Sequence, residues 1–238
     1  MTKKIEKTSE KKETKKAKKD YSSIYDQTIP YKLDEAISIV KKLSKTKFDP
    51  SVEVHIRLGI NPKKGDQLVR GAVTLPHGTG KTVRVAAFVS PDNEAACKTA
   101  GAEFVGGDEL ISEIKKTGKT EFEVAVAEPL MMRNLAVIAK ILGTRGLMPS
   151  PKNDTVTPNP AKAVEELKKG KVSFKNDDTS NLHAVIGKLS FEDKKLSENY
   201  LAFIEAVRKI KPAAAKGTYI KGISICASMT PSVKVIIS

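Results

Sequence analysis

The amino-acid sequence predicts a two-domain α/β protein, in which a βαβαβα domain is inserted into an outer α+β domain. Within residues 78–170, short apolar strands alternate with helical segments, a pattern typical of a parallel sheet covered by helices. On either side of that stretch the strands come in pairs, which favours an antiparallel or mixed layer. The charged residues are also distributed unevenly between these two parts of the chain. Residues 21–77 and 171–238 together hold 20 basic and 12 acidic side chains, whereas residues 78–170 hold 13 and 12.

The N-terminal third begins with a lysine-rich segment. Residues 1–20 contain nine lysines, four acidic residues and almost no apolar side chains, so we expect a disordered arm. Such an arm either only improves solubility or lies along phosphates, and both readings stay open. Apolar residues then recur at helical spacing over residues 33–45. Residues 51–59 alternate between apolar and polar side chains, which predicts a strand with one buried face. A second strand is expected near residues 69–76.

The remaining elements follow in the order that the fold class requires. For the inserted domain we expect strands at 83–89, 103–105 and 121–127, helices at 92–100, 108–117 and 131–142, a loop over 143–160 and a helix at 161–169. The outer domain then resumes with strands at 171–176 and 183–189, a helix at 192–210, and strands at 218–228 and 232–237. Two strands are expected to cross between the domains as a hinge.

Composition indicates a polyanionic partner. The chain has 238 residues, a formal net charge of +14 and a pI of about 9.6. Nucleic acid is the commonest reason for such an excess, and the outer domain, with its larger excess, should dock first. The two cysteines, Cys97 and Cys226, form no CxxC motif, so we expect neither a disulfide framework nor a cysteine-based zinc module. We find no secretory signal and no membrane span, and expect an intracellular, soluble protein.

Two glycine-rich stretches suggest nucleotide binding without meeting its requirements. Residues 75–85 (LPHGTGKTVRV) lack a P-loop's first glycine, because Leu75 stands there, and lead into a strand instead of a helix. We expect a turn or hinge at this position. Residues 101–107 (GAEFVGG) follow a helix instead of a strand, so they match a dinucleotide fingerprint only weakly.

The titratable residues do not suggest a metal or catalytic site. His55, His77 and His183 lack the spacing of metal ligands along the chain. The acidic pair Asp177 and Asp178 lacks a third oxygen ligand at calcium spacing. We therefore expect no metal, no cofactor and no catalytic residues.

Five stretches together resemble the bacterial form of the large-subunit ribosomal protein L-one family. The most informative is GTRGLMPSPKNDTVTPN, which lies within residues 141–159. The others are residues 46–81, 101–110 (GAEFVGGDEL), 174–191 (FKNDDTSNLHAVIGKLSF) and 216–233 (KGTYIKGISICASMTPSV). They match the family in order and spacing, and the resemblance covers residues 21–238.

The resemblance implies a fold, a function and a set of partners. The inserted domain would be Rossmann-like. The protein would bind large-subunit ribosomal RNA at the mobile lateral stalk, assist deacylated tRNA in leaving the exit site, and repress translation of its own mRNA. We accordingly expect a cytoplasmic, ribosomal location, no enzyme activity, no membrane and no obligate homo-oligomer.

The resemblance also implies RNA-contacting residues in the outer domain. They form a first group at the start of the first strand, a second before the strand at 183–189 and a third near the C-terminus: Lys47, Phe48, Ser51 and Glu53; Lys175, Asp177 and Thr179; and Ser228, Met229, Thr230 and Ser232.

This chain departs from the family pattern at three places. Thr230 stands where glycine is usual, which implies a looser backbone approach to the RNA. Thr144 replaces a proline and implies a less rigid loop. The family's Lys-Thr-Gly at residues 178–180 is absent here, and one cation is lost with it.

Several alternatives remain at this point. Phe48 could belong to the core, Met229 could be a buried strand end, and Glu53 can help RNA binding only by accepting a hydrogen bond or by orienting a lysine. A nucleotide-dependent enzyme built on the βαβαβα domain is the competing function.

Overall fold

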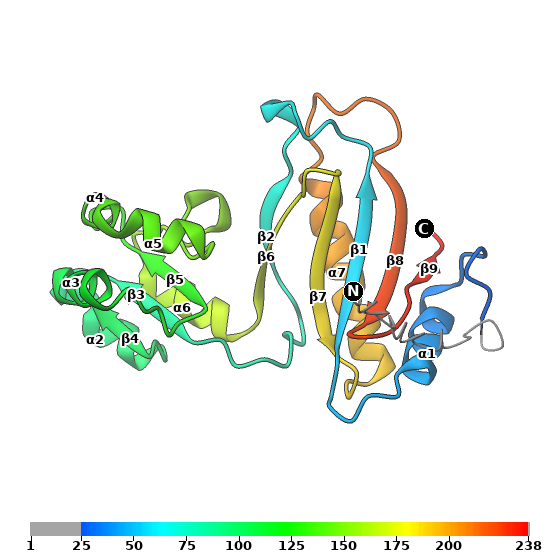
Figure 1. Ribbon diagram of the computed structural model, residues 1–238, viewed down its shortest axis with the longest axis horizontal. Helices are drawn as coiled ribbons and strands as arrows, with labels where there is room; N and C mark the ends of the chain where they lie inside the picture. Colours follow the sequence, from blue (N-terminus) through cyan, green and yellow to red (C-terminus); the bar gives the residue numbers. More distant parts are fainter. Residues whose placement is uncertain (1–24, 238) are drawn as a thin grey trace, which may run out of the picture.

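The computed structural model describes residues 25–237, and the predicted arm at residues 1–20 lies outside them. Within the described residues the strands form three sheets. One has four strands in the order β7-β1-β8-β9, one has two strands, β2 and β6, and one has three strands in the order β4-β3-β5 (Figure 1). A mixed α/β fold is therefore confirmed. No helix in this part of the chain combines the length and apolarity that crossing a membrane would require.

The four-stranded sheet is antiparallel and has one buried face. Its strands are β1 (Ser51–Leu58), β7 (Asn181–Lys188), β8 (Ile220–Ala227) and β9 (Val233–Val235). The helices α1 (Leu33–Leu43) and α7 (Asp193–Lys209) pack against the same face and share one hydrophobic core with it. The alternation predicted over residues 51–59 is confirmed, because Val52, Val54, Ile56 and Leu58 are all buried in that core. The opposite face carries mainly polar side chains.

The three-stranded sheet is parallel and carries a core on each face. Its strands are β3 (Val85–Phe88), β4 (Phe104–Gly106) and β5 (Val124–Ala127), with β3 in the centre. Because β3 is covered on both faces, all four of its residues are buried. One cluster joins the sheet to α2 (Pro91–Thr99) and α6 (Pro160–Lys168). The other joins it to α3 (Asp108–Thr117), α4 (Met132–Leu135) and α5 (Ala139–Thr144).

The two remaining strands form a ribbon that lies between the larger sheets (Figure 1). β2 (Arg70–Thr74) and β6 (Lys171–Lys175) pair antiparallel along their full length. The strands predicted at 171–176 and 183–189 follow one another in the sequence but do not pair with each other: β6 pairs with β2, and β7 pairs with β1. The division at residues 77 and 170 stays a prediction, and the separate hydrophobic clusters agree with it.

The predicted helix at 131–142 is interrupted. A 3₁₀ turn (η2, Ala136–Ile138) separates α4 from α5. The 3₁₀ geometry brings residues three apart onto one side, which keeps Leu135 and Ile138 in the core together with Leu142. The predicted loop over residues 143–160 contains the end of α5 and a 3₁₀ turn (η3, Pro151–Asn153). Elsewhere in the chain, another 3₁₀ turn (η1, Gly65–Gln67) precedes β2.

The glycine-rich stretch at residues 75–85 runs into β3 without forming a helix, as predicted. It is fastened by Asn199 of α7, which is fully buried. The Asn199 side chain accepts a hydrogen bond from the His77 backbone N–H at 3.0 Å. It donates to the backbone carbonyls of Gly78 at 2.9 Å and Ile186 at 2.7 Å. One side chain thus ties α7, β7 and the segment entering the three-stranded sheet together.

Candidate RNA interface

The face of the four-stranded sheet turned away from α1 and α7, called the open face below, is lined by polar side chains. Residues at alternate positions of one strand point to the same side, so the positions between the buried ones project here. The side chains in question are Glu53, His55 and Arg57 of β1, His183 of β7, and Ser224 and Cys226 of β8. Such a face can accept a polar partner without exposing the core.

The first and third predicted groups meet at one end of this sheet. The backbone N–H of Ser228 donates to the carbonyl of Ser51 at 3.0 Å, which joins the turn after β8 to the start of β1. Ser51 itself is buried. Phe48 is 58% exposed and Met229 84% exposed. The core position considered for Phe48 and the buried strand end considered for Met229 are therefore both wrong.

Met229 occupies a backbone conformation that is unusual for its residue type. Its φ of 70° lies in the left-handed region, where a side chain costs about 1–2 kcal/mol. The turn that holds it is closed by Thr230, whose backbone N–H donates to the Ala227 carbonyl at 2.9 Å. Strain of this kind persists where the surrounding structure or a function demands it.

The second predicted group lies at the other end of the sheet, between β6 and β7. Asp177 accepts hydrogen bonds from the Thr179 hydroxyl at 2.6 Å and from the backbone N–H groups of Asn181 at 2.7 Å and Thr179 at 2.9 Å. These bonds hold the pKa of the Asp177 carboxyl well below its usual range, and the bond from the Thr179 hydroxyl contributes most. Lys175, at the end of β6, is exposed.

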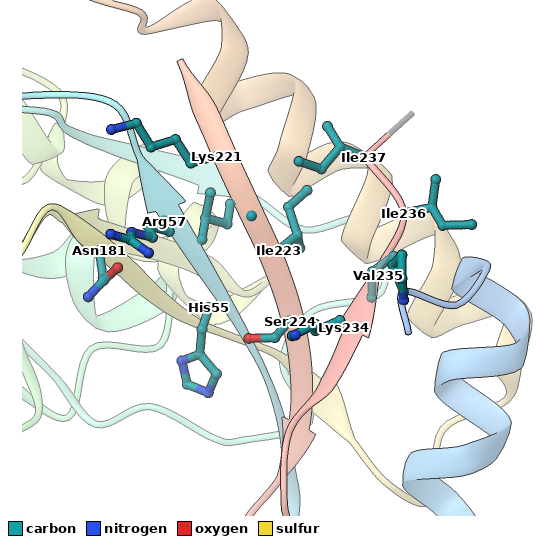
Figure 2. Close-up of a pocket in the computed structure, with 13 residues that line it drawn as sticks. His55, Arg57, Asn181, Lys221, Ile223, Ser224, Lys234, Val235, Ile236 and Ile237 are labelled. Atoms are coloured by element: carbon teal, nitrogen blue, oxygen red, sulfur yellow. The ribbon is translucent and has the colours of Figure 1, made fainter. Parts of the chain in front are cut away.

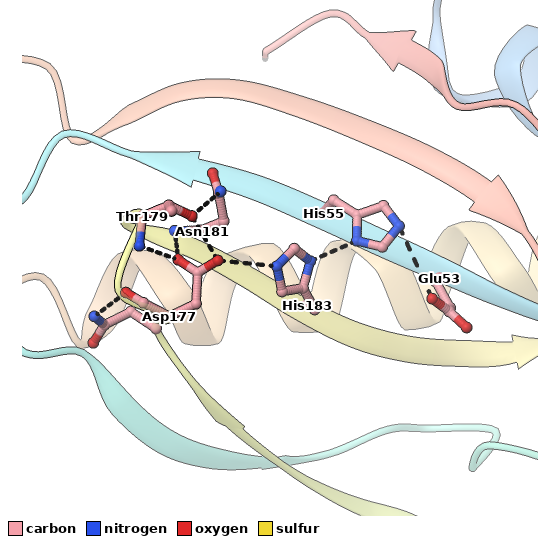
Figure 3. A network of polar contacts seen from close by, with 7 residues as sticks. Glu53, His55, Asp177, Thr179, Asn181 and His183 are labelled. Carbon is pink, nitrogen blue, oxygen red and sulfur yellow. Dashed lines mark hydrogen bonds and ion pairs between the residues drawn. The ribbon is translucent and has the colours of Figure 1, made fainter. Parts of the chain in front are cut away.

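A chain of polar contacts crosses the open face between the two ends (Figure 3). Asp177 Oδ2 lies 3.5 Å from His183 Nε2, and His183 Nδ1 lies 2.7 Å from His55 Nδ1. His55 Nε2 then lies 3.1 Å from Cys226 Sγ and 4.0 Å from Glu53 Oε2. Burial first, and the neighbouring His183 second, lower the pKa of His55. Burial, with the nearby Glu53, raises the pKa of Cys226 to about 11.

A shallow groove of about 600 Å³ lies beside this row of polar contacts. It is lined by basic residues that the sequence did not indicate as site residues. Arg57, Lys221 and Lys234 line it together with Asn181 and Ser224 (Figure 2). The sequence offers one signal, because Arg57 falls on the predicted polar face of residues 51–59. Lys221 and Lys234 join it only through the pairing of β1 with β8 and of β8 with β9.

Comparison with known families matches residues 40–231 to the ribosomal protein L1p/L10e family. The chain belongs to this family. The resemblance noted in the sequence is thereby confirmed. The relatives that carry the name large ribosomal subunit protein uL1 include the following three. That of Kosmotoga olearia is 50% identical over 211 residues, which cover 89% of this chain and 91% of the relative. That of Corynebacterium glutamicum (strain R) is 52% identical over 201 residues, which cover 84% of this chain and 85% of the relative. That of Solidesulfovibrio magneticus is 50% identical over 210 residues, which cover 88% of this chain and 89% of the relative.

The two threonines that depart from the family pattern both make local hydrogen bonds. The Thr230 hydroxyl accepts from the Ala227 N–H and donates to the Ala227 carbonyl, each at 2.9 Å, which a glycine could not do. Thr144 ends α5, and its hydroxyl bonds the carbonyls of Lys140 and Ile141 at 3.1 Å. Both threonine hydroxyls therefore hydrogen-bond to nearby backbone groups.

Proposed function

We propose that the protein binds large-subunit ribosomal RNA through the open face and the two loops at its end, residues 47–50 and 228–232. The observation that carries this proposal is the pair of exposed apolar side chains, Phe48 in the loop before β1 and Met229 in the hydrogen-bonded turn after β8. Neither side chain contributes to the core. RNA helices display riboses in a wide, shallow minor groove, against which such side chains can lie flat.

The polar side chains nearby suit the rest of an RNA surface. Lys47, Lys175 and the three basic residues of the groove can contact phosphates, and these contacts supply most of the affinity. The Glu53 carboxylate carries the same charge sign as RNA, so it acts by accepting a hydrogen bond from a base or a 2′-hydroxyl. The second group, with Asp177 and Thr179, extends the surface to the far end of the sheet.

The finer assignments rest on family membership. The relatives are named as proteins of the large ribosomal subunit, and the same location is proposed for this chain. We place it at the mobile lateral stalk, where it would assist release of deacylated tRNA from the exit site. Repression of its own mRNA would follow if that mRNA presents a similar RNA site to the same surface. The protein acts by binding in each of these roles, without catalysis.

The competing function, a nucleotide-dependent enzyme, has less support. The glycine-rich stretch at 75–85 opens a strand, so it offers no helix N-terminus to a phosphate. A nucleotide titration of the full chain discriminates the two functions, because the RNA-binding proposal expects no saturable nucleotide site.

Replacing Arg57, Lys221 and Lys234 together with glutamine tests the RNA-binding surface. Binding to large-subunit ribosomal RNA should weaken, and the slope of log affinity against log salt should fall by about 2–3, since each lost phosphate contact removes roughly 0.7–0.9. Filter binding over a range of salt concentrations measures both quantities.

A matched control removes the same charge from the opposite side of the sheet. Lys194, Lys195 and Lys209 are exposed on α7, and their replacement with glutamine should change the slope far less. Equal losses from the two triple variants would mean that binding follows net charge alone and that the proposed surface is incorrect.

A further inference from the structure

Three side chains of different chemistry converge near the middle of the open face. One carboxylate oxygen of Glu53, one ring nitrogen of His55 and the sulfur of Cys226 lie within 4.8 Å of one another. The strand register produces this arrangement, because Glu53 is paired with Cys226 across β1 and β8, and His55 lies two residues along on the same face. All three are partly exposed, so an ion can reach them from solvent.

A second, independent feature is the orientation of His55 (Figure 3). His183 Nε2 faces the Asp177 carboxylate at 3.5 Å, and the tautomer that donates its Nε2–H to that carboxylate leaves His183 Nδ1 as an acceptor. In this tautomer His55 Nδ1–H donates to His183 Nδ1 at 2.7 Å. The lone pair of His55 Nε2 is thereby directed at Cys226 and Glu53. Histidines that bind metals are typically held in this way, through the ring nitrogen that does not touch the ion.

We propose that Glu53, His55 and Cys226 bind a divalent transition-metal ion of the zinc type. A thiolate, an imidazole and a carboxylate form a ligand set that suits zinc and cobalt, whereas magnesium and calcium take oxygen ligands. On binding, the Cys226 thiol proton, which now faces His55 Nε2 at 3.1 Å, is released to solvent and the ion takes its place. The fourth position faces outward and is filled by water.

The inference goes beyond the proposed RNA binding and does not depend on it. His183 and Asp177 act as positioning residues, since they touch His55 or each other and not the ion. The spacing of histidines along the chain predicts no such site, because Cys226 and His55 are 171 residues apart in sequence. The pairing of β1 with β8 brings the ligands together, and the pairing of β1 with β7 places His183 beside His55.

Titration of the metal-free full chain with Co²⁺ tests the site. We expect binding of one equivalent, with a thiolate-to-cobalt charge-transfer band in the near ultraviolet that Zn²⁺ abolishes by displacement. Cys226→Ser should remove the band. Cys97→Ser serves as the matched control, because Cys97 is fully buried in a different core cluster, and should keep it. A wild-type chain without the band, or a Cys226→Ser chain that retains it, would overturn the proposal.

Two further variants keep the test decisive if Cys226→Ser fails to fold. His55→Gln removes a ligand from a partly exposed position and should abolish the one-equivalent binding while the circular dichroism spectrum is unchanged. His183→Gln should lower the Co²⁺ affinity about 10- to 100-fold and retain the charge-transfer band, as expected for a residue that orients a ligand. Unchanged affinity in the folded His55→Gln chain would contradict the site.

Discussion

Replacing Phe48 with alanine is expected to weaken binding to large-subunit ribosomal RNA by roughly 1–3 kcal/mol, about a 5- to 150-fold rise in Kd. The ring is 58% exposed, so little of the folding free energy depends on it. The melting temperature should therefore stay nearly unchanged. A binding titration and a thermal melt on the same variant measure the two effects.

A matched control separates an RNA contact from a general loss of apolar surface. Leu201 is 50% exposed on α7, away from the open face, and Leu201→Ala should leave RNA binding unaltered. Met229→Gly provides a second check. Glycine tolerates a φ of 70°, so this variant should bind RNA more weakly while being as stable as the wild type or more so. A Phe48→Ala chain that melts much earlier but binds normally would contradict the contact.

Asn199→Ala should lower the free energy of unfolding by about 2–5 kcal/mol. The substitution leaves two backbone carbonyls and one N–H without their partner, of which the Ile186 carbonyl is in a buried bond and the other two groups in partly buried bonds. Each such group costs up to roughly 1–3 kcal/mol when water cannot replace the lost partner. The value lies below the plain sum because local relaxation recovers part of the loss. Equilibrium unfolding in urea measures it.

Asn134→Ala is the matched control for this prediction. Asn134 is also a helical asparagine with a side-chain hydrogen bond, to Asp108 at 2.7 Å, but that bond is exposed. Replacing Asn134 should lower the free energy of unfolding by at most about 0.5 kcal/mol. If the two variants lose equal stability, the burial of Asn199 does not have the role assigned to it.

Local sequence periodicity predicts much of the fold because it reflects burial directly. Residues 51–59 reveal both the core face and the polar face of β1, and the apolar run of β3 reveals a strand covered on both sides. The interruption between α4 and α5 cannot be predicted in this way, since a 3₁₀ turn changes the number of residues per turn by less than one. Asn199 escapes it too, because its importance comes from partners on β7 and the segment before β3.

The candidate site is predicted only in part for a related reason. Family resemblance supplies the residues at the two ends of the sheet, whereas Lys221, Lys234 and the contacts among His55, His183 and Cys226 depend on strand pairing. The partners of the strands predicted at 171–176 and 183–189 show the limit. Neighbouring strands in sequence need not be neighbours in a sheet, and here β6 pairs with β2 and β7 with β1, both far earlier in the sequence.

The central claim, that RNA lies on the open face and its end loops, is tested most directly by ultraviolet crosslinking of the full chain to large-subunit ribosomal RNA. Mass spectrometry of the crosslinked peptides locates the contacts without any substitution. We expect crosslinks at Phe48, at Met229 and in the peptides that contain β1 and β8. Crosslinks confined to residues 78–170 would contradict the account.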